Sequence, residues 1–141
     1  MFTSTAPSSA AVAGASYTAT AVSSRGLSPV SLTVAAASSS VCTISGGTVS
    51  FIGAGSCNLF ANQGGDGNYD PATQVLQTFV VGKGSQTLSF TSAAPTGALV
   101  AGSTYTPTSI SNRGLVPVIS VNASSSSVYG GNTKVPLSVS Y

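Results

Sequence analysis

The fold is decided by Cys42-Thr-Ile-Ser-Gly-Gly-Thr-Val-Ser-Phe51, a segment with the pattern of a β-hairpin. Apolar residues alternate with polar ones on both sides of the central Gly-Gly pair, so each arm has one apolar face and one polar face. The two glycines supply the backbone conformations that a tight turn between antiparallel strands requires. The segment therefore predicts two antiparallel strands with one buried face.

Short runs of similar character stand on both sides of this hairpin. They are rich in β-branched residues, and clusters of Gly, Pro, Ser and Asn separate them, as is typical of strands joined by turns. No stretch has the pattern of a helix, so we expect an all-β fold. The predicted strands cover residues 17–22, 30–34, 42–45, 48–52, 57–62 and 75–81.

The composition narrows the class of protein. Charged residues make up 4% of the chain, whereas an average globular protein has roughly 25%. A surface so poor in charge must be solvated by hydroxyls and amides, which suits strands with one face lined by Ser and Thr. The four cations are scattered along the chain, so nucleic acid is not expected as a partner. No apolar run approaches ~18 residues, so membrane insertion is not expected either.

The inventory of reactive side chains excludes the common catalytic sets. The chain has no His, and its only acidic residues are Asp66 and Asp70, which share one turn-like segment. Neither a Ser-His-Asp triad nor a separated pair of carboxylates can be assembled from these residues. We therefore expect a protein that is not an enzyme and has no cofactor.

The sequence repeats itself. The hexapeptide Phe2-Thr-Ser-Thr-Ala-Pro7 returns 88 residues later as Phe90-Thr-Ser-Ala-Ala-Pro95. A unit of this length fits a small β-sandwich domain. We expect one complete repeat in residues 1–84 and a partial second repeat, with a divergent C-terminal strand, in residues 85–141. Further matches in the same register are Gly14 with Gly102, Tyr17 with Tyr105, Arg25-Gly-Leu27 with Arg113-Gly-Leu115, and Pro29-Val30 with Pro117-Val118.

Several segments together resemble the bacterial immunoglobulin-like repeats that occur in tandem in large extracellular surface and adhesin-like proteins. The resemblance implies an immunoglobulin-like β-sandwich at the cell surface or outside the cell. It also implies a non-catalytic structural or adhesive module that acts as a stiff spacer, with neighbouring repeats of the same protein as its partners. The resemblance rests on Phe-Thr-Ser-x-Ala-Pro at 2–7, Gly-Leu-x-Pro-Val at 26–30, Ser-Ser-Ser-Val-Cys at 38–42, Gly-x-Gly-Ser-Cys at 53–57, Ala-Asn-Gln-x-Gly-x-x-x-Tyr-x-Pro-Ala at 61–72 and Val-Gly-Lys-Gly-Ser-Gln-Thr-Leu-Ser-Phe at 81–90.

The two cysteines, Cys42 and Cys57, are predicted to form a disulfide. They are 15 residues apart, and both lie on the inward phase of their strands, beside Ile44 and Leu59. A disulfide that closes a loop of this size contributes roughly 3 kcal/mol to stability. Two buried free thiols are the alternative. A redox or metal-binding pair is less favoured, because the spacing is not CxxC and the chain has no His.

Asp66, Asn68 and Asp70 form a candidate calcium site. Their oxygen-bearing side chains stand at alternate positions, as in a calcium-binding loop. The pattern then fails, because Pro71 stands where it wants Gly and Gln77 where it wants a bidentate Glu. A polar turn before the strand at 75–81 is the favoured interpretation.

Other candidate functions rest on single features. The repeated Arg25 and Arg113 are expected in loops, with a binding tip as the alternative, and Tyr17 and Tyr105 are expected in the core rather than as a sugar-stacking platform. A self-assembling subunit, and with it a homo-oligomer through edge strands, would use the alternating segment 135–141 as a donated strand. A carbohydrate-binding module would rest on Thr-rich strands such as 104–108.

Overall fold

A computed structural model describes residues 1–99, 101–121 and 137–140 of the chain. Their regular structure consists of antiparallel strands and one short turn of 3-10 helix, η1 (Ala36–Ser38), so the predicted all-β class is confirmed. Within these ranges, no helix is long and apolar enough to cross a membrane.

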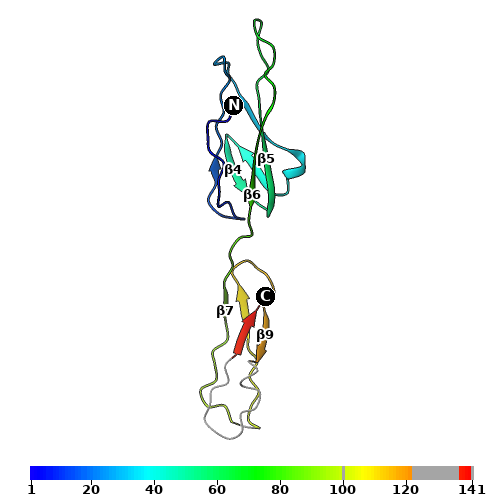
Figure 1. The fold of residues 1–141 in the computed structure, drawn as a ribbon. Coiled ribbons are helices and arrows are strands. Elements are labelled where there is room, and N and C mark those ends of the chain that lie inside the picture. The colour runs from blue at the N-terminus through cyan, green and yellow to red at the C-terminus, as the bar shows by residue number, and fades with distance from the viewer. Residues whose placement is uncertain (100, 122–136, 141) are drawn as a thin grey trace. The chain divides into compact units, whose positions relative to one another are not determined.

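The chain divides into two compact units, unit 1 (Met1–Gly84) and unit 2 (Ser85–Tyr141). Figure 1 shows both units, with β4, β5 and β6 labelled in unit 1 and β7 and β9 in unit 2. The strands of unit 1 are β1 (Tyr17–Thr18), β2 (Ser31–Val34), β3 (Cys42–Ser45), β4 (Thr48–Phe51), β5 (Gly55–Asn62) and β6 (Val75–Val81). The described strands of unit 2 are β7 (Leu88–Phe90), β8 (Ser109–Ser111), β9 (Val118–Val121) and β10 (Leu137–Ser140).

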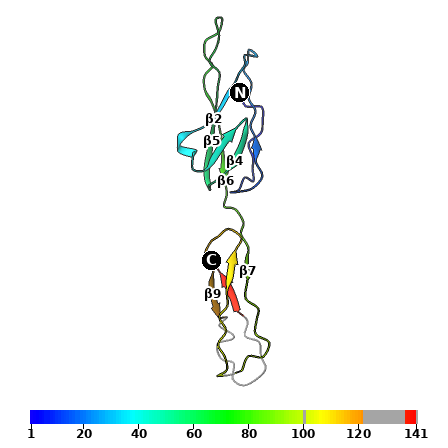
Figure 2. The ribbon, with the colours of Figure 1, turned by 180° about the vertical axis from the view of Figure 1, so that it is seen from behind.

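Unit 1 contains two antiparallel sheets. The strand order is β1-β4-β3 in one sheet and β2-β5-β6 in the other. Figure 2, the view from behind, labels β2, β4, β5 and β6 of this unit. The predicted hairpin is confirmed: β3 pairs with β4, and Gly46 and Gly47 between them have φ angles of 54° and 82°. Because positive φ at both central positions matches the twist of the flanking strands, the Gly-Gly pair suits this two-residue connection.

The predicted strand at 17–22 is shorter in the structure because its residues divide between two partners. Tyr17 and Thr18 pair with β4, whereas Ala21 forms a separate antiparallel bridge with Phe2. A second bridge joins Ala11 to Gly82 in parallel. The N-terminal segment, residues 2–11, therefore pairs near its start with the residues that follow β1 and at its end with Gly82, just after β6.

The core of unit 1 combines buried residues from both sheets, an arrangement compatible with a β-sandwich. Phe79 of β6 packs edge-on against Tyr17 of β1 and Phe51 of β4, with ring centroids 5.7 and 5.8 Å apart. Such edge-to-face contacts add to the free energy gained by burying the rings. The buried cluster consists of Ala19, Val41, Cys42, Val49, Phe51, Cys57, Leu59, Phe79 and Val81.

Unit 2 contains two described strand pairs. β7 pairs with β8, and β9 pairs with β10, both antiparallel. Of the C-terminal segment in which the divergent strand is expected, the structure describes only Leu137–Ser140. Of the alternating segment 135–141, Leu137–Ser140 forms β10 and is paired with β9 of the same chain, and the other residues are outside the description.

Candidate functional site

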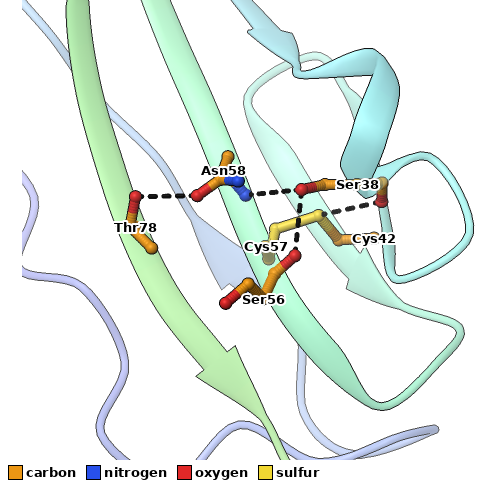
Figure 3. Close-up of a disulfide and its surroundings, with 6 residues drawn as sticks. All are labelled: Ser38, Cys42, Ser56, Cys57, Asn58 and Thr78. Atoms are coloured by element: carbon orange, nitrogen blue, oxygen red, sulfur yellow. Dashed lines mark hydrogen bonds between the residues drawn. A yellow bond between two sulfur atoms is a disulfide. The ribbon is translucent and has the colours of Figure 1, made fainter.

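The disulfide predicted from the two cysteines is present in unit 1 (Figure 3). Cys42 lies on β3 and Cys57 on β5, so the 1.97 Å Sγ–Sγ bond joins one sheet to the other. Both residues are completely buried. The disulfide therefore crosses the core as a covalent link between the sheets.

A buried serine lies beside the disulfide. The Ser38 hydroxyl, on η1, donates a hydrogen bond to the Ser56 carbonyl at 2.9 Å and accepts one from the Asn58 amide at 3.2 Å (Figure 3). The Cys42 sulfur is 3.8 Å from the Ser38 carbonyl oxygen, and this contact has no proton to share because the sulfur is in the disulfide. Ser38 thus holds η1 against β5. Sequence reasoning missed it, because one serine in a serine run carries no distinguishing signal.

A polar network joins the sheets at a second place. The Tyr17 hydroxyl on β1 donates to Gln77 Oε1 on β6 at 2.8 Å, and Gln77 Nε2 donates to the Ser4 carbonyl at 3.0 Å. The Ser4 hydroxyl is hydrogen-bonded to the Tyr17 hydroxyl and accepts a hydrogen bond from the Thr20 amide at 2.9 Å. The Tyr17 hydroxyl is therefore hydrogen-bonded, and its partly buried ring packs against the core, as expected for a core aromatic.

Part of this network recurs 88 residues later. In unit 2 the Ser92 hydroxyl bonds to the Tyr105 hydroxyl at 2.7 Å and accepts the Thr108 amide at 2.9 Å. The Thr91 and Thr108 hydroxyls are 2.7 Å apart, as the hydroxyls of their counterparts at 3 and 20 are. The self-similar segments therefore adopt the same local hydrogen bonding in both units.

Segment 63–74, which connects β5 and β6 and contains the candidate calcium residues, lies against the repeated arginine of unit 1, Arg25. The Arg25 guanidinium lies over the Tyr69 ring, 5.6 Å from its centroid. Tyr69 belongs to segment 63–74, which extends beyond β5 and β6 in Figure 1. A shallow groove of about 200 Å³ lies at this end, lined mainly by apolar groups that include Met1, Val22 and Val75. The contact between Arg25 and Tyr69 can hold segment 63–74 in place, but it forms no arrangement of acid, base and nucleophile.

The candidate calcium residues form a turn. Asp66 Oδ1 accepts hydrogen bonds from the Asn68 and Tyr69 amides at 2.8 and 3.0 Å, and the Asp66 amide donates to the Tyr69 carbonyl at 2.9 Å. These bonds account for Asp66 as a turn-closing residue. Among the described residues, no cluster of three or more His, Cys, Asp or Glu side chains could hold a metal ion.

Comparisons of this chain with protein-family models, with curated proteins and with solved structures gave no match. The functional argument therefore rests on the geometry of the chain itself. Two features of that geometry bear on function: the links between the sheets of unit 1, and the contacts that recur after 88 residues.

Proposed function

We propose that this chain is a non-catalytic structural module of an extracellular or cell-surface protein, in which immunoglobulin-like units act in tandem as a stiff spacer. The observation that carries the proposal is the double link between the two sheets of unit 1. The disulfide joins β3 to β5, and the Tyr17–Gln77 hydrogen bond joins β1 to β6. A sandwich whose sheets are linked at two places resists their separation.

The strand order supports the immunoglobulin-like part of the proposal. In that fold, strands A, B, E and D form one sheet and strands C, F and G the other. The same order results when the Phe2 segment is A, β1 is B, and β4 and β3 are E and D. The second sheet, β2-β5-β6, then corresponds to C, F and G. One difference is that the disulfide joins D to F, whereas antibody domains join B to F.

The proposed extracellular location is supported by the disulfide, because such bonds persist in oxidising compartments. The tandem arrangement is supported by the hydrogen bonds shared by the Ser4 and Ser92 networks. We propose that neighbouring repeats of this kind are the partners of each unit. The 4% charged composition suits a module whose stability changes little with salt.

The competing functions gain no specific support. The donated strand of a self-assembling subunit would include Leu137–Ser140, which is paired with β9 of the same chain. A sugar-stacking platform would need free tyrosine faces and hydroxyls, whereas the hydroxyls of Tyr17 and Tyr105 bond to serines of their own units.

Single-molecule pulling from the two termini tests the spacer function. We expect a distinct force peak for the unfolding of unit 1. Under reducing conditions the length released should grow by roughly 50 Å, because the residues enclosed by the disulfide extend at about 3.5 Å each. The Cys42→Ser/Cys57→Ser variant is the control and should give the longer release with or without reductant.

Extension of the oxidised chain without a force peak would contradict the proposal. Light scattering and a glycan array on the same preparation test the alternatives. Polymers that form with rising concentration would favour strand exchange, and a specific glycan signal would favour carbohydrate binding.

A further inference from the structure

The segment that leads into unit 2 is held by the loop that follows β8. Two backbone-directed bonds involve Asn112: its Oδ1 accepts the Thr87 amide at 3.0 Å, and its own amide donates to the Thr87 carbonyl at 3.1 Å. Arg113 Nε donates to the Ser85 carbonyl at 3.2 Å, and the Ser111 hydroxyl donates to Gln86 Oε1 at 3.1 Å. Each residue of the entry segment, 85–87, is therefore bonded either to Ser111, the last residue of β8, or to the loop that follows it.

The last residues of unit 1 are held within their own unit. The Gly82 amide donates to the Ala10 carbonyl at 2.8 Å, and the Gly82 carbonyl accepts the Val12 amide at 3.0 Å. Between Gly82 and the entry segment stand only Lys83 and Gly84. Lys83 is exposed, and the nearest bonded residues are Gly82 before it and Ser85 after Gly84.

We propose that Arg113 and Asn112 are positioning residues that hold the entry segment on unit 2 and thereby withhold the Lys83–Gly84 peptide bond from proteases. A trypsin-like protease accepts several residues on each side of the cleaved bond in extended form. Residues 85–87 must leave the loop before they can enter such a cleft, so cleavage follows the population of the opened segment. That the same contacts stiffen the connection between repeats rests on the proposed spacer function, whereas the protection of this bond does not.

The chain supplies a matched control 88 residues earlier. Arg25 and Arg113 lie in the same local turn: their amides bond to the Ser23 and Ser111 hydroxyls at 3.3 and 3.1 Å, and the glycine after each has φ of 71°. The two guanidinium groups nevertheless have different partners, because that of Arg25 lies over Tyr69. Removing Arg25 therefore leaves the entry segment of unit 2 untouched.

Limited trypsin digestion of the oxidised full chain tests the proposal. The readout is the initial rate at which intact chain gives the fragment pair 1–83 and 84–141, followed by mass spectrometry. For Arg113→Ala and for Asn112→Ala we expect this rate to rise about five-fold or more, the change that follows from losing one hydrogen bond that closes the segment. Arg25→Ala should cut at the wild-type rate.

A conservative variant separates loosening of the entry segment from loss of folding. Asn112→Asp keeps an oxygen acceptor for the Thr87 amide, so it should stay within about two-fold of the wild-type rate. Hydrogen exchange of the β7–β8 pair, in which Leu88 is opposite Ser111, reports whether unit 2 remains folded. If Arg113→Ala loses this protection, the comparison of Asn112→Ala with Asn112→Asp decides.

Unchanged cleavage in a folded Asn112→Ala variant would overturn the proposal, and so would equal acceleration by Arg25→Ala. Neither result affects the spacer function, which the pulling experiment tests through unit 1. If the chain extends without a force peak but shows the expected cleavage pattern, the spacer function is contradicted and the protection of the Lys83–Gly84 bond still stands.

Discussion

Tyr17 and Gln77 are 60 residues apart in the sequence, and the tyrosine hydroxyl donates a 2.8 Å hydrogen bond to the glutamine Oε1. The bond runs from β1 in one sheet to β6 in the other. Gln77 also donates to the Ser4 carbonyl, so the amide side chain is used at both ends. Among the described residues, every buried side-chain polar atom has a hydrogen-bond partner.

Replacing Tyr17 with Phe should destabilise unit 1 by about 1–2 kcal/mol. The ring and its contact with Phe79 remain, but Gln77 Oε1 loses its donor inside a part-buried network, and an unsatisfied polar group is costly there. Chemical denaturation gives the change in free energy. Thr3→Val, which removes an exposed hydroxyl bond to Thr20, is the control and should stay within about 0.5 kcal/mol. Equal effects of the two variants would refute the network's role.

Removing the disulfide should cost unit 1 about 3 kcal/mol, the value expected for a closed loop of this length. Because both cysteines are completely buried, the Cys42→Ser/Cys57→Ser variant also loses apolar contacts and places hydroxyls in the core. Its loss should therefore be at least as large as the loss on reduction of the wild-type chain. Denaturation curves recorded with and without reductant provide the comparison, and a reductant effect in the variant would contradict this assignment.

Ser38→Ala should destabilise unit 1 by about 1–3 kcal/mol, because the Asn58 amide and the Ser56 carbonyl lose their common partner. Ser39→Ala is the matched control. Its exposed hydroxyl bonds only to the Ala36 carbonyl in the same turn, so the change should stay within about 0.5 kcal/mol. Thermal melts distinguish the two variants, since 1 kcal/mol shifts the midpoint of a domain of this size by about 4–8 °C.

Gly53→Ala should be among the more damaging single substitutions in the connection between β4 and β5. A Cβ at this position would lie 2.2 Å from the Ser40 carbonyl oxygen, so the backbone must move. We expect a loss of about 1–3 kcal/mol, as for other overpacked sites. Gly67→Ala, where a Cβ would have no neighbour within 4 Å, should fold with nearly wild-type stability. The denaturation midpoints of the two variants check this expectation.

The predictable parts of unit 1 depend on residues close in sequence. Alternation around Gly46 and Gly47 is a local signal, and the structure has the hairpin where the pattern places it. Cysteine pairing was predictable because the chain has only Cys42 and Cys57, which can form one intramolecular disulfide. The strand at 17–22 was overestimated because Ala21 pairs with Phe2 and not with β4, a choice that no local pattern encodes.

The loop contacts show the same division. Arg25 and Arg113 were expected in loops from the glycine that follows each, and both lie in the same type of turn. Their partners, Tyr69 and the Ser85 carbonyl, could not be predicted, because both are distant in sequence and the Arg-Gly-Leu motif is the same in the two copies. The Asp66 turn, in contrast, uses neighbours within three residues, and its composition indicated it.

The all-β class, the central hairpin and the 88-residue recurrence can be read from the sequence alone, because alternation, turn residues and self-similarity are local properties of a chain. Which strands share a sheet is known only from the folded chain. That choice brought Gln77 to Tyr17, Ser38 to Asn58 and Arg113 to Ser85. The physical reason is that two strands can pair or face each other at any sequence separation, and packing of the whole core selects the arrangement that buries the apolar faces together.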